Sequence, residues 1–563
     1  MCQPAPRALL GGRGRRADVH RGVPDLRQQV RQGLSTAAAR VHRGRVRPPR
    51  RSSLVDNAGS GRLASGGDSG GNVRPPEGGT TMRTMIQGGW VVGHAGGGHE
   101  LIPNGCVVFE DDRVIHVGAT FDGPVDRRVD AVGKLVAPGL INCHLHAATN
   151  AGQAVFLDGL KADYFGSNFV GYVAPRRGTA MPRAGDRADV AGTYGLWSAL
   201  RAGATTIMDV GTMPGGPASF TKIAGELGVR AYVGPAFRSA SYAFDGSRIV
   251  WEWDEAAGMT GLERAVAFIK EHDGAYGGRI KAMLYPGQLD TCTPELLRQA
   301  RRWADDLGVP MQLHAAMNQR EFHHILEQHG QTPIQLLHSI GFLKPRTGLG
   351  HCVFHNDHSW CHYPYADDLK LLADSGVTVV HAPYKYAKMG VKFESFERYR
   401  GLGINLALGT DTYPQDLIHE MRWAALMCRL ADGSFRVGRP QDVFDAATLG
   451  GARHLGRDDL GRLAPGAKAD IIVVDLRHLH YGAVHDPIKA LVDCGSGRDV
   501  ETVIVDGQTL VENGRATRLD EQALLRDVQA EGERLWRAIP QWHWTGKPLD
   551  EVVPPSYPVR GAH

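Results

Sequence analysis

The chain has 563 residues, of which 42% are hydrophobic and 7% aromatic, so it can bury a large core and has room for more than one domain. Its formal net charge is +4, but the charge is unevenly distributed along the chain. Residues 1–81 hold fifteen arginines and five acidic residues, whereas the remainder is mildly acidic. An acidic body argues against nucleic acid as a partner, and the lack of any run of about 18 apolar residues argues against a membrane span.

The first 81 residues are rich in arginine, glycine, proline, alanine and serine, with almost no apolar periodicity. A segment of this composition cannot bury enough apolar surface to offset the conformational entropy lost on folding, so we expect it to be disordered. The segment is either a leader of the transit-peptide kind or, the reading we favour, untranslated sequence upstream of a start at Met82 or Met85. The eight cysteines include no Cys-x-x-Cys pair, which disfavours redox motifs and disulfide frameworks and fits a reducing cytoplasm.

Short alternating runs begin at residue 82 and predict an antiparallel sheet over residues 82–137. The same texture returns in residues 459–516, where a strand runs into the turn Asp506-Gly507. We therefore expect the two flanks to form one composite β-sandwich, followed by a C-terminal helix and tail over residues 517–563.

Between the flanks, residues 138–458 alternate apolar, β-rich runs with helix-length segments, as a parallel (β/α)₈ TIM barrel requires. Helix signals fall between the strands: Thr293-Pro294-Glu295 is a start signal, and Leu417 to Leu430 is an apolar periodic stretch. The eight predicted strands are residues 135–142, 204–210, 229–236, 279–286, 309–315, 347–354, 376–383 and 403–410.

Histidines and one aspartate close these strands. His144 and His146 stand two residues apart at the end of the first, so both side chains share a face. His314, His351 and His381 end the fifth, sixth and seventh strands, and Asp411 follows the eighth. Such side chains at the functional end of a barrel predict a metal site. A second His-x-His, His478-Leu479-His480, has no partner ligands in prospect and is predicted to be a surface turn.

The chain resembles the amidohydrolase superfamily of metal-dependent hydrolases, in particular its cytosine deaminase, guanine deaminase and s-triazine chlorohydrolase branch. The resemblance spans residues 85–537, and its most specific segments are residues 138–146, 407–411 and 461–470. It implies a distorted (β/α)₈ barrel beside a composite β-sandwich. It also implies that His144, His146, His314 and Asp411 bind one divalent metal ion, zinc or alternatively iron, which gives a metal-activated water. His351 would assist the water or substrate, and Asp411 would carry the proton.

The chain departs from this pattern after the fifth predicted strand. The resemblance to the deaminases of the branch implies a His-x-x-Glu motif there, but His314 is followed by Ala315, Ala316 and Met317. A thioether cannot protonate a ring nitrogen, so aromatic deamination is disfavoured. Glu321 is expected to be a surface cap rather than a substitute. We expect Lys281 to form an ion pair, and His355, His358 and His362 to belong to a polar loop. A second metal ion bound at Lys281 or at these three histidines is the less favoured alternative.

The sequence therefore predicts a cytoplasmic metal-dependent hydrolase that cleaves a non-peptide carbon–nitrogen bond in a small molecule, such as an amide, urea, carbamate or cyclic amide. One alternative is an aminohydrolase or chlorohydrolase acting on a heteroaromatic ring. Another is a non-catalytic scaffold with the same fold, but a scaffold would have no need of four metal ligands. By resemblance, a homo-oligomer is plausible. The residues expected to contact substrate are His351, His381, Tyr384, Tyr285 and Trp251.

Overall fold

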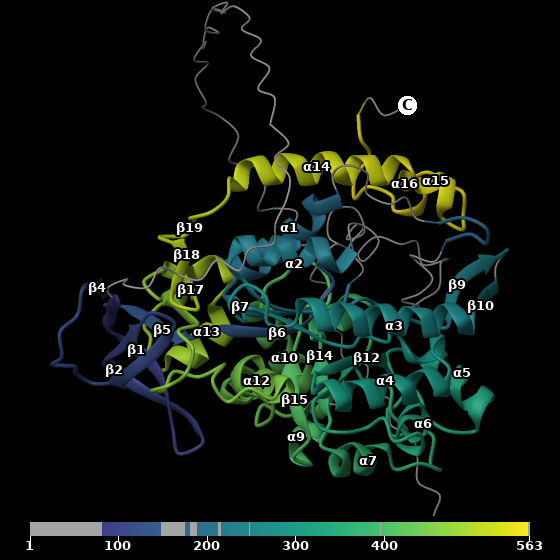
Figure 1. Ribbon diagram of the computed structural model, residues 1–563, viewed down its shortest axis with the longest axis horizontal. Coiled ribbons are helices and arrows are strands. Elements are labelled where there is room, and N and C mark those ends of the chain that lie inside the picture. The colour runs from purple at the N-terminus through teal and green to yellow at the C-terminus, as the bar shows by residue number, and fades with distance from the viewer. Residues whose placement is uncertain are drawn as a thin grey trace, which may run out of the picture. The chain divides into compact units, whose positions relative to one another are not determined.

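The computed structural model describes residues 81–147, 175–180, 188–211, 216–246, 248–394 and 396–560. The predicted disorder of residues 1–81 therefore lies outside the described residues, apart from Thr81. The described chain is of the α/β class and contains mixed and parallel sheets (Figure 1). No helix in the described ranges is long and apolar enough to cross a membrane.

The two flanks of the chain meet in one nine-stranded sheet. Strand β5 (Lys134–Pro138) from the N-terminal flank pairs antiparallel with β16 (Ile471–Asp475) from the C-terminal flank. The strands follow the order β19-β18-β17-β16-β5-β1-β2-β3, with β4 beside β1. The remaining strands are β1 (Arg83–Ala95), β2 (Gly98–Glu110), β3 (Arg113–Gly118), β4 (Arg127–Asp130), β17 (Val500–Val505), β18 (Gln508–Glu512) and β19 (Arg515–Ala516).

Two four-stranded parallel sheets hold the eight central strands. The first has the order β11-β8-β7-β6 and the second the order β12-β13-β14-β15. Isolated bridges join them at both ends, Leu284 to Met311 and Leu145 to Asp411. All eight predicted strands are present, in shorter form: β6 (Leu140–Leu145), β7 (Ala204–Asp209), β8 (Arg230–Val233), β11 (Ile280–Ala282), β12 (Met311–Ala315), β13 (Thr347–His351), β14 (Thr378–His381) and β15 (Asn405–Leu408).

The predicted first strand is wrong in one respect, because the chain divides it at Gly139. Its first part, β5, belongs to the nine-stranded sheet, and its second part, β6, pairs with β7. A β-carbon at Gly139 would lie 2.1 Å from Thr205 Oγ1, so only glycine fits where the chain passes from one sheet to the other. As a result His144 lies inside β6, and His146 follows it directly.

Helices cover the parallel strands, and their ends follow the sequence signals. Thr293 caps α4 by accepting a hydrogen bond from Leu296 N, and α10 starts at the predicted Leu417. Figure 1 shows α14 passing over α1, which it contacts. The longer helices are α1 (Ala188–Arg201), α2 (Gly216–Leu227), α3 (Glu255–His272), α4 (Pro294–Leu307), α5 (Gln319–His329), α7 (Asp368–Ser375), α10 (Leu417–Asp432), α13 (Pro487–Cys494) and α14 (Glu521–Arg537).

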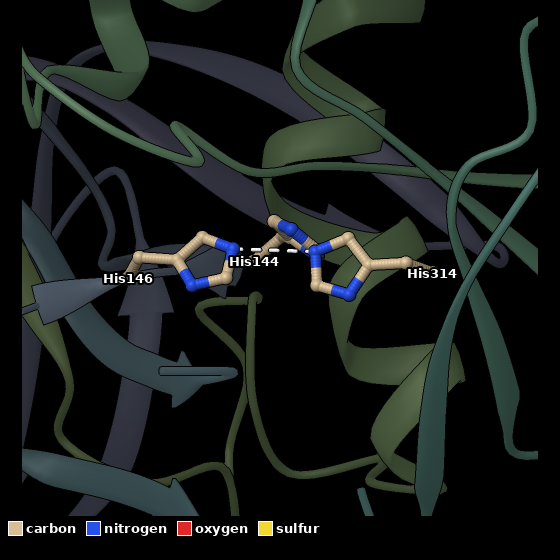
Figure 2. A group of neighbouring side chains, drawn as sticks. All are labelled: His144, His146 and His314. Carbon is tan, nitrogen blue, oxygen red and sulfur yellow. Dashed lines mark hydrogen bonds between the residues drawn. The ribbon is translucent and has the colours of Figure 1, made fainter. Parts of the chain in front are cut away.

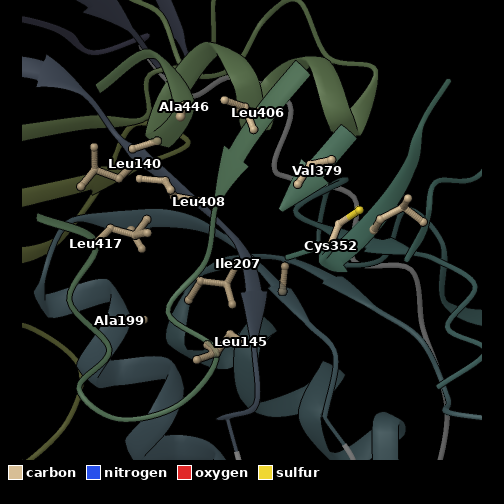
Figure 3. Packing of buried hydrophobic residues seen from close by; sticks show 14 of the residues in the cluster. Leu140, Leu145, Ala199, Ile207, Cys352, Val379, Leu406, Leu408, Leu417 and Ala446 are labelled. Carbon is tan, nitrogen blue, oxygen red and sulfur yellow. The ribbon is translucent and has the colours of Figure 1, made fainter. Parts of the chain in front are cut away.

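The largest hydrophobic core lies between the parallel strands and these helices. Leu140 of β6, Ile207 of β7, Val379 of β14 and Leu406 of β15 converge with helical side chains (Figure 3). Each is at most 7% exposed, and burying an aliphatic side chain of this size contributes about 1.5–3 kcal/mol. This packing holds the carboxyl ends of the strands in fixed positions.

Candidate metal centre

Three imidazoles converge at the carboxyl ends of β6 and β12. His144, His146 and His314 each offer a ring nitrogen within 4.8 Å of the others, and Figure 2 shows the rings directed toward one another. The Nε2 atoms of His146 and His314 are 3.2 Å apart. The fold therefore brings together candidate ligands that come from different parallel sheets and lie about 170 residues apart in the sequence.

The tautomer of His144 is set by Gln312 of β12. Gln312 Nε2 donates to the carbonyl of Cys143 at 2.8 Å, which orients the amide so that its oxygen faces His144 Nδ1 at 2.9 Å. Because an amide oxygen only accepts, His144 Nδ1 must carry the proton and its Nε2 keeps a free lone pair. A second hydrogen-bonding group of this kind is what orients a metal-binding histidine.

His314 is oriented in the same way from the other side of the site. Its Nδ1 lies 3.0 Å from the carbonyl of Gly287 and 3.1 Å from the hydroxyl of Tyr285. Donation to the carbonyl leaves His314 Nε2 unprotonated and directed at His146. Tyr285, which is predicted from the sequence to contact substrate, thus lies against the candidate ligand His314.

Asp411 completes the group from the turn after β15. Its Oδ1 is 3.6 Å from His146 Nε2 and its Oδ2 is 3.2 Å from His351 Nε2. The backbones of Asp411 and His351 both lie in the left-handed region, with φ of 58° and 75°. Non-glycine residues in this conformation concentrate at functional sites, where surrounding packing holds the strained backbone.

The ammonium group of Lys385 contacts Asp411 Oδ2. Lys385 lies in α8 (Pro383–Lys388) and is 3% exposed, so this ion pair is buried. Burial lowers the pKa of Lys385 to about 8, while Asp411 acts in the opposite direction. The sequence signal for it is weak, because a lysine in a loop after a strand is usually solvated.

Burial keeps the imidazoles of the site neutral. It lowers the pKa of His146 to about 4 and of His314 to about 3, and it places the pKa of His144 well below its usual value. Neighbouring charges such as His146 and Lys385 add to this effect at His144 and His314. Neutral imidazole is the form that binds a metal ion, so the donors are ready near neutral pH.

This donor set fits a divalent metal ion. His144 Nε2 and Asp411 Oδ1 are buried and have no hydrogen-bond partner among the described residues, although such groups are normally satisfied. Three imidazole nitrogens and one carboxylate match the preferences of zinc. Within the described ranges, the groups able to hold an ion are formed by His144, His146, His314, His351 and Asp411.

The turn after β12 differs from the prediction at Glu321. Glu321 is fully buried, with Oε1 accepting from Ala316 N and Oε2 from Met317 N, both at 2.8 Å. It is therefore not a surface cap: its carboxylate clamps the turn that follows His314, where Ala316 has a φ of 49°. Met317 is buried as well, and its carbonyl accepts from Tyr386.

Three predicted substrate residues pack against other aromatic rings. His381 is buried among aromatic rings, with Phe393 and Tyr399 centroids 4.4 Å and 5.6 Å away, which is a packing environment. The ring of Tyr384 contacts His419 and Trp423. Trp251 stacks on His324 at 3.9 Å. His351, like Tyr285, lies beside the candidate ligands, 3.2 Å from Asp411.

The alternative metal residues do not converge in the described part of the chain. Lys281 pairs with Asp273 at 3.3 Å, as expected of an ion-paired lysine. His358 Nε2 faces the carbonyl of Lys392, and His355 lies 6.4 Å from it between ring centroids. The second His-x-His is half-exposed, with His478 and His480 beside Asp499, as predicted for a surface turn.

Comparison with known proteins identifies similar chains. The model of the Amidohydrolase family matches residues 135–510. A 5′-deoxyadenosine deaminase of Methanosarcina mazei is 28% identical over 438 residues, covering 77% of this chain and 94% of that protein. A 5-methylthioadenosine/S-adenosylhomocysteine deaminase of Natronomonas pharaonis is 31% identical over 431 residues, covering 76% and 92%.

Two solved structures share the fold. An adenosine deaminase from Xanthomonas campestris with bound zinc has a TM-score of 0.64 and 22% identity, covering 81% of this chain and 98% of that one. The zinc complex of atrazine chlorohydrolase from Arthrobacter aurescens has a TM-score of 0.65 and 23% identity, covering 80% and 99%. At these identities the likeness concerns the fold alone.

Proposed function

Because this chain belongs to the amidohydrolase family, we propose that it hydrolyses a carbon–nitrogen bond other than a peptide bond with a metal-activated water. The observation that carries the proposal is the buried convergence of His144, His146, His314 and Asp411. The unsatisfied donor atoms among them speak against a non-catalytic scaffold. One zinc ion per chain is the proposed cofactor, supported by the donor set and by the zinc in both solved structures.

The proposed architecture is a distorted (β/α)₈ barrel formed by the two parallel sheets, beside a β-sandwich built on the nine-stranded sheet. The bridges Leu284 to Met311 and Leu145 to Asp411 support closure, because they connect the outer strands of the two sheets. In such a barrel the ligands lie at the carboxyl ends of the strands, where active sites form.

The side chains around the donors have distinct tasks. A divalent ion bound there supplies Lewis acidity, which lowers the pKa of a water to about 7. Asp411 Oδ2, next to His351 and Lys385, is placed to accept a proton and deliver it to the leaving nitrogen. His351 and Lys385 would stabilise negative charge that develops on a substrate oxygen.

The proposed substrate is an amide, urea, carbamate or cyclic amide. Its reaction develops charge on a carbonyl oxygen and needs no proton on a ring nitrogen. The chain has Met317 where a ring acid is expected, and Glu321 uses both carboxylate oxygens on backbone amides. Neither residue supplies the general acid that ring deamination requires, and such an acid is worth about 10²–10⁴ in rate.

The second candidate is an aminohydrolase that releases ammonia from an aminated heterocycle. The deaminase names of the relatives favour it, since 28–31% identity extends over three quarters of this chain. In that reaction Lys385 is the nearest available proton donor to the ligand Asp411. The chlorohydrolase variant of this candidate rests on fold likeness alone.

A substrate panel separates the two candidates. We would assay zinc-loaded protein on amides, ureas and carbamates and, separately, on adenosine derivatives, cytosine, guanine and aminotriazines, measuring amine and ammonia release. The first candidate predicts turnover in the first group, lost in Asp411→Asn and retained within about tenfold in Met317→Ala. Efficient ammonia release from any aminated heterocycle would replace it with the second.

The remaining proposals concern the setting of the enzyme. Its partner is a small-molecule substrate, as the small adenosine derivatives named for its relatives support. A cytoplasmic location follows from the cysteine pattern, and a homo-oligomer from the family resemblance alone.

A further inference from the structure

A cavity of about 430 Å³ lies far from the candidate metal centre in the fold. It is bounded on one side by the turn of the β1–β2 hairpin, through His94 and Gly97, and on the other by the segment from Arg453 to Arg462 that contains the end of α12 (Gly451–Leu455). Its volume falls in the range of small-molecule sites, about 300–1,000 Å³.

The cavity is near the amino-terminal end of β15. Arg453 Nη1 donates to the side-chain oxygen of Asn405, the first residue of β15, at 2.6 Å. Asp411 follows the opposite end of the same strand. A ligand in this cavity would therefore be separated from the metal centre by the length of the strand.

Three guanidinium groups line the cavity, and two of them are uncompensated. Arg457 is neutralised by two hydrogen bonds to Asp459, at 2.7 Å and 2.9 Å. Arg453 and Arg462 make no ion pair within the described ranges. Asp458 is the acidic group in the lining. Two guanidinium groups without an ion pair, against the one carboxylate of Asp458, leave the lining of the cavity positive.

The walls are held by contacts between the hairpin and the segment after α12. His94 N donates to the carbonyl of Leu463 at 3.0 Å, and His99 Nε2 lies 3.0 Å from Thr448 Oγ1. Gly456 ends α12 in the left-handed conformation, so the carbonyl end of that helix faces this region. Attraction for an anion must therefore come from the arginines rather than from the helix.

We propose that this cavity binds a phosphate group, either as the free ion or on a small phosphorylated molecule. Planar guanidinium groups match phosphate oxygens in paired hydrogen bonds, and Arg453 and Arg462 bring two such groups to the cavity lining. The volume exceeds that of the ion alone, so a small phosphorylated molecule has room. This site is independent of the proposed hydrolysis.

Isothermal titration of the zinc-loaded protein with inorganic phosphate, and in parallel with ribose 5-phosphate, tests the proposal at constant ionic strength. The double variant Arg453→Gln/Arg462→Gln should bind at least about tenfold more weakly, through loss of charge-assisted hydrogen bonds. Asp458→Asn should bind more tightly, because it removes a repulsive charge. Tighter binding of ribose 5-phosphate than of inorganic phosphate would identify a small phosphorylated molecule as the ligand. Equal binding of the two would identify the free ion as the ligand.

Two controls locate the binding. Arg436→Gln changes an arginine outside the cavity and should leave the affinity unchanged. His144→Ala disrupts the metal centre and should also leave it unchanged, which separates this site from phosphate bound to zinc. The proposal is overturned if phosphate does not bind, if the double variant keeps wild-type affinity, or if His144→Ala abolishes binding.

Discussion

At the scale of single residues, the role proposed for Lys385 rests on a buried contact that the sequence does not reveal. Its buried ammonium group contacts Asp411, the proposed proton carrier. We expect Lys385→Met to lower kcat/KM by at least about tenfold, because a charge that stabilises the transition state in a buried site is lost. Zinc content should stay near one ion per chain. Lys370→Met, at an exposed lysine, is the control, and wild-type activity of Lys385→Met would contradict this role.

The two His-x-His segments provide a matched pair for metal binding. His144→Ala removes a buried donor and should reduce the zinc content measured by elemental analysis to a small fraction. His478→Ala alters a half-exposed turn and should leave about one ion per chain. Equal loss of zinc in both variants would show that the wrong segment was chosen, and two tightly bound ions in the wild type would contradict a single-metal site.

The candidate ligands were predictable because each follows an apolar run, a pattern visible in the sequence alone. The groups that orient them were not. Gln312 and Tyr285 reach His144 and His314 through hydrogen bonds that depend on how the strands pair. Glu321 was misassigned because a glutamate in the first turn of a helix is usually exposed, and its burial depends on the turn after β12 folding back over it.

At the scale of elements, the turn after β12 depends on the carboxylate of Glu321. Burial and the neighbouring Asp290 raise its pKa, whereas the two backbone N–H groups favour the ionised form that accepts both hydrogen bonds. Glu321→Gln keeps the shape of the side chain but places an NH₂ group opposite a backbone N–H. That backbone donor then has no acceptor, which lowers the free energy of unfolding by about 1–3 kcal/mol. We expect urea unfolding to show this loss and zinc affinity to fall. Glu327→Gln, at an exposed position of the same helix, should change neither, and unchanged stability of Glu321→Gln would rule out the clamp.

The docking of the β1–β2 hairpin is expected to depend on pH through His99. Burial lowers its pKa to about 4, below the unfolded value of 6.5. The unfolded chain therefore binds a proton that the folded chain excludes, so stability is complete above pH 6.5 and is lost as pH falls toward 4, by up to about 3 kcal/mol. Urea unfolding at pH 7 and pH 4.5 should show a smaller difference in His99→Gln than in wild type. A difference unchanged by the substitution, as expected for His478→Gln, would contradict this.

The strands were predicted in number and order because their apolar runs are continuous. The break at Gly139 was not visible, since Leu135 to Asn142 reads as one apolar run whether it serves one sheet or two. Which sheet each half joins is decided by partners far along the chain, β16 and β7. Pairing between distant segments is the information that a local pattern lacks.

At the scale of the whole molecule, the proposed metal ion would cross-link the two parallel sheets, because its ligands come from β6 on one side and from β12 and the end of β15 on the other. A ligand that binds only the folded chain stabilises it by mass action, about 4 kcal/mol at a thousandfold excess over its dissociation constant. Chelation should therefore lower Tm by several degrees, and added zinc should restore it. An equal effect of chelator on His144→Ala would show that zinc acts elsewhere.

The pairing of β5 with β16 sets a limit on how the chain can be shortened. Strand β16 carries Ile471, Ile472, Val473 and Val474, all buried, and it obtains its neighbour on one side from the N-terminal flank. An expression fragment that begins at residue 139 would expose this strand as an unprotected apolar edge, the kind of surface that nucleates aggregation between molecules. Insolubility of such a fragment would then report a missing strand rather than an unstable catalytic centre.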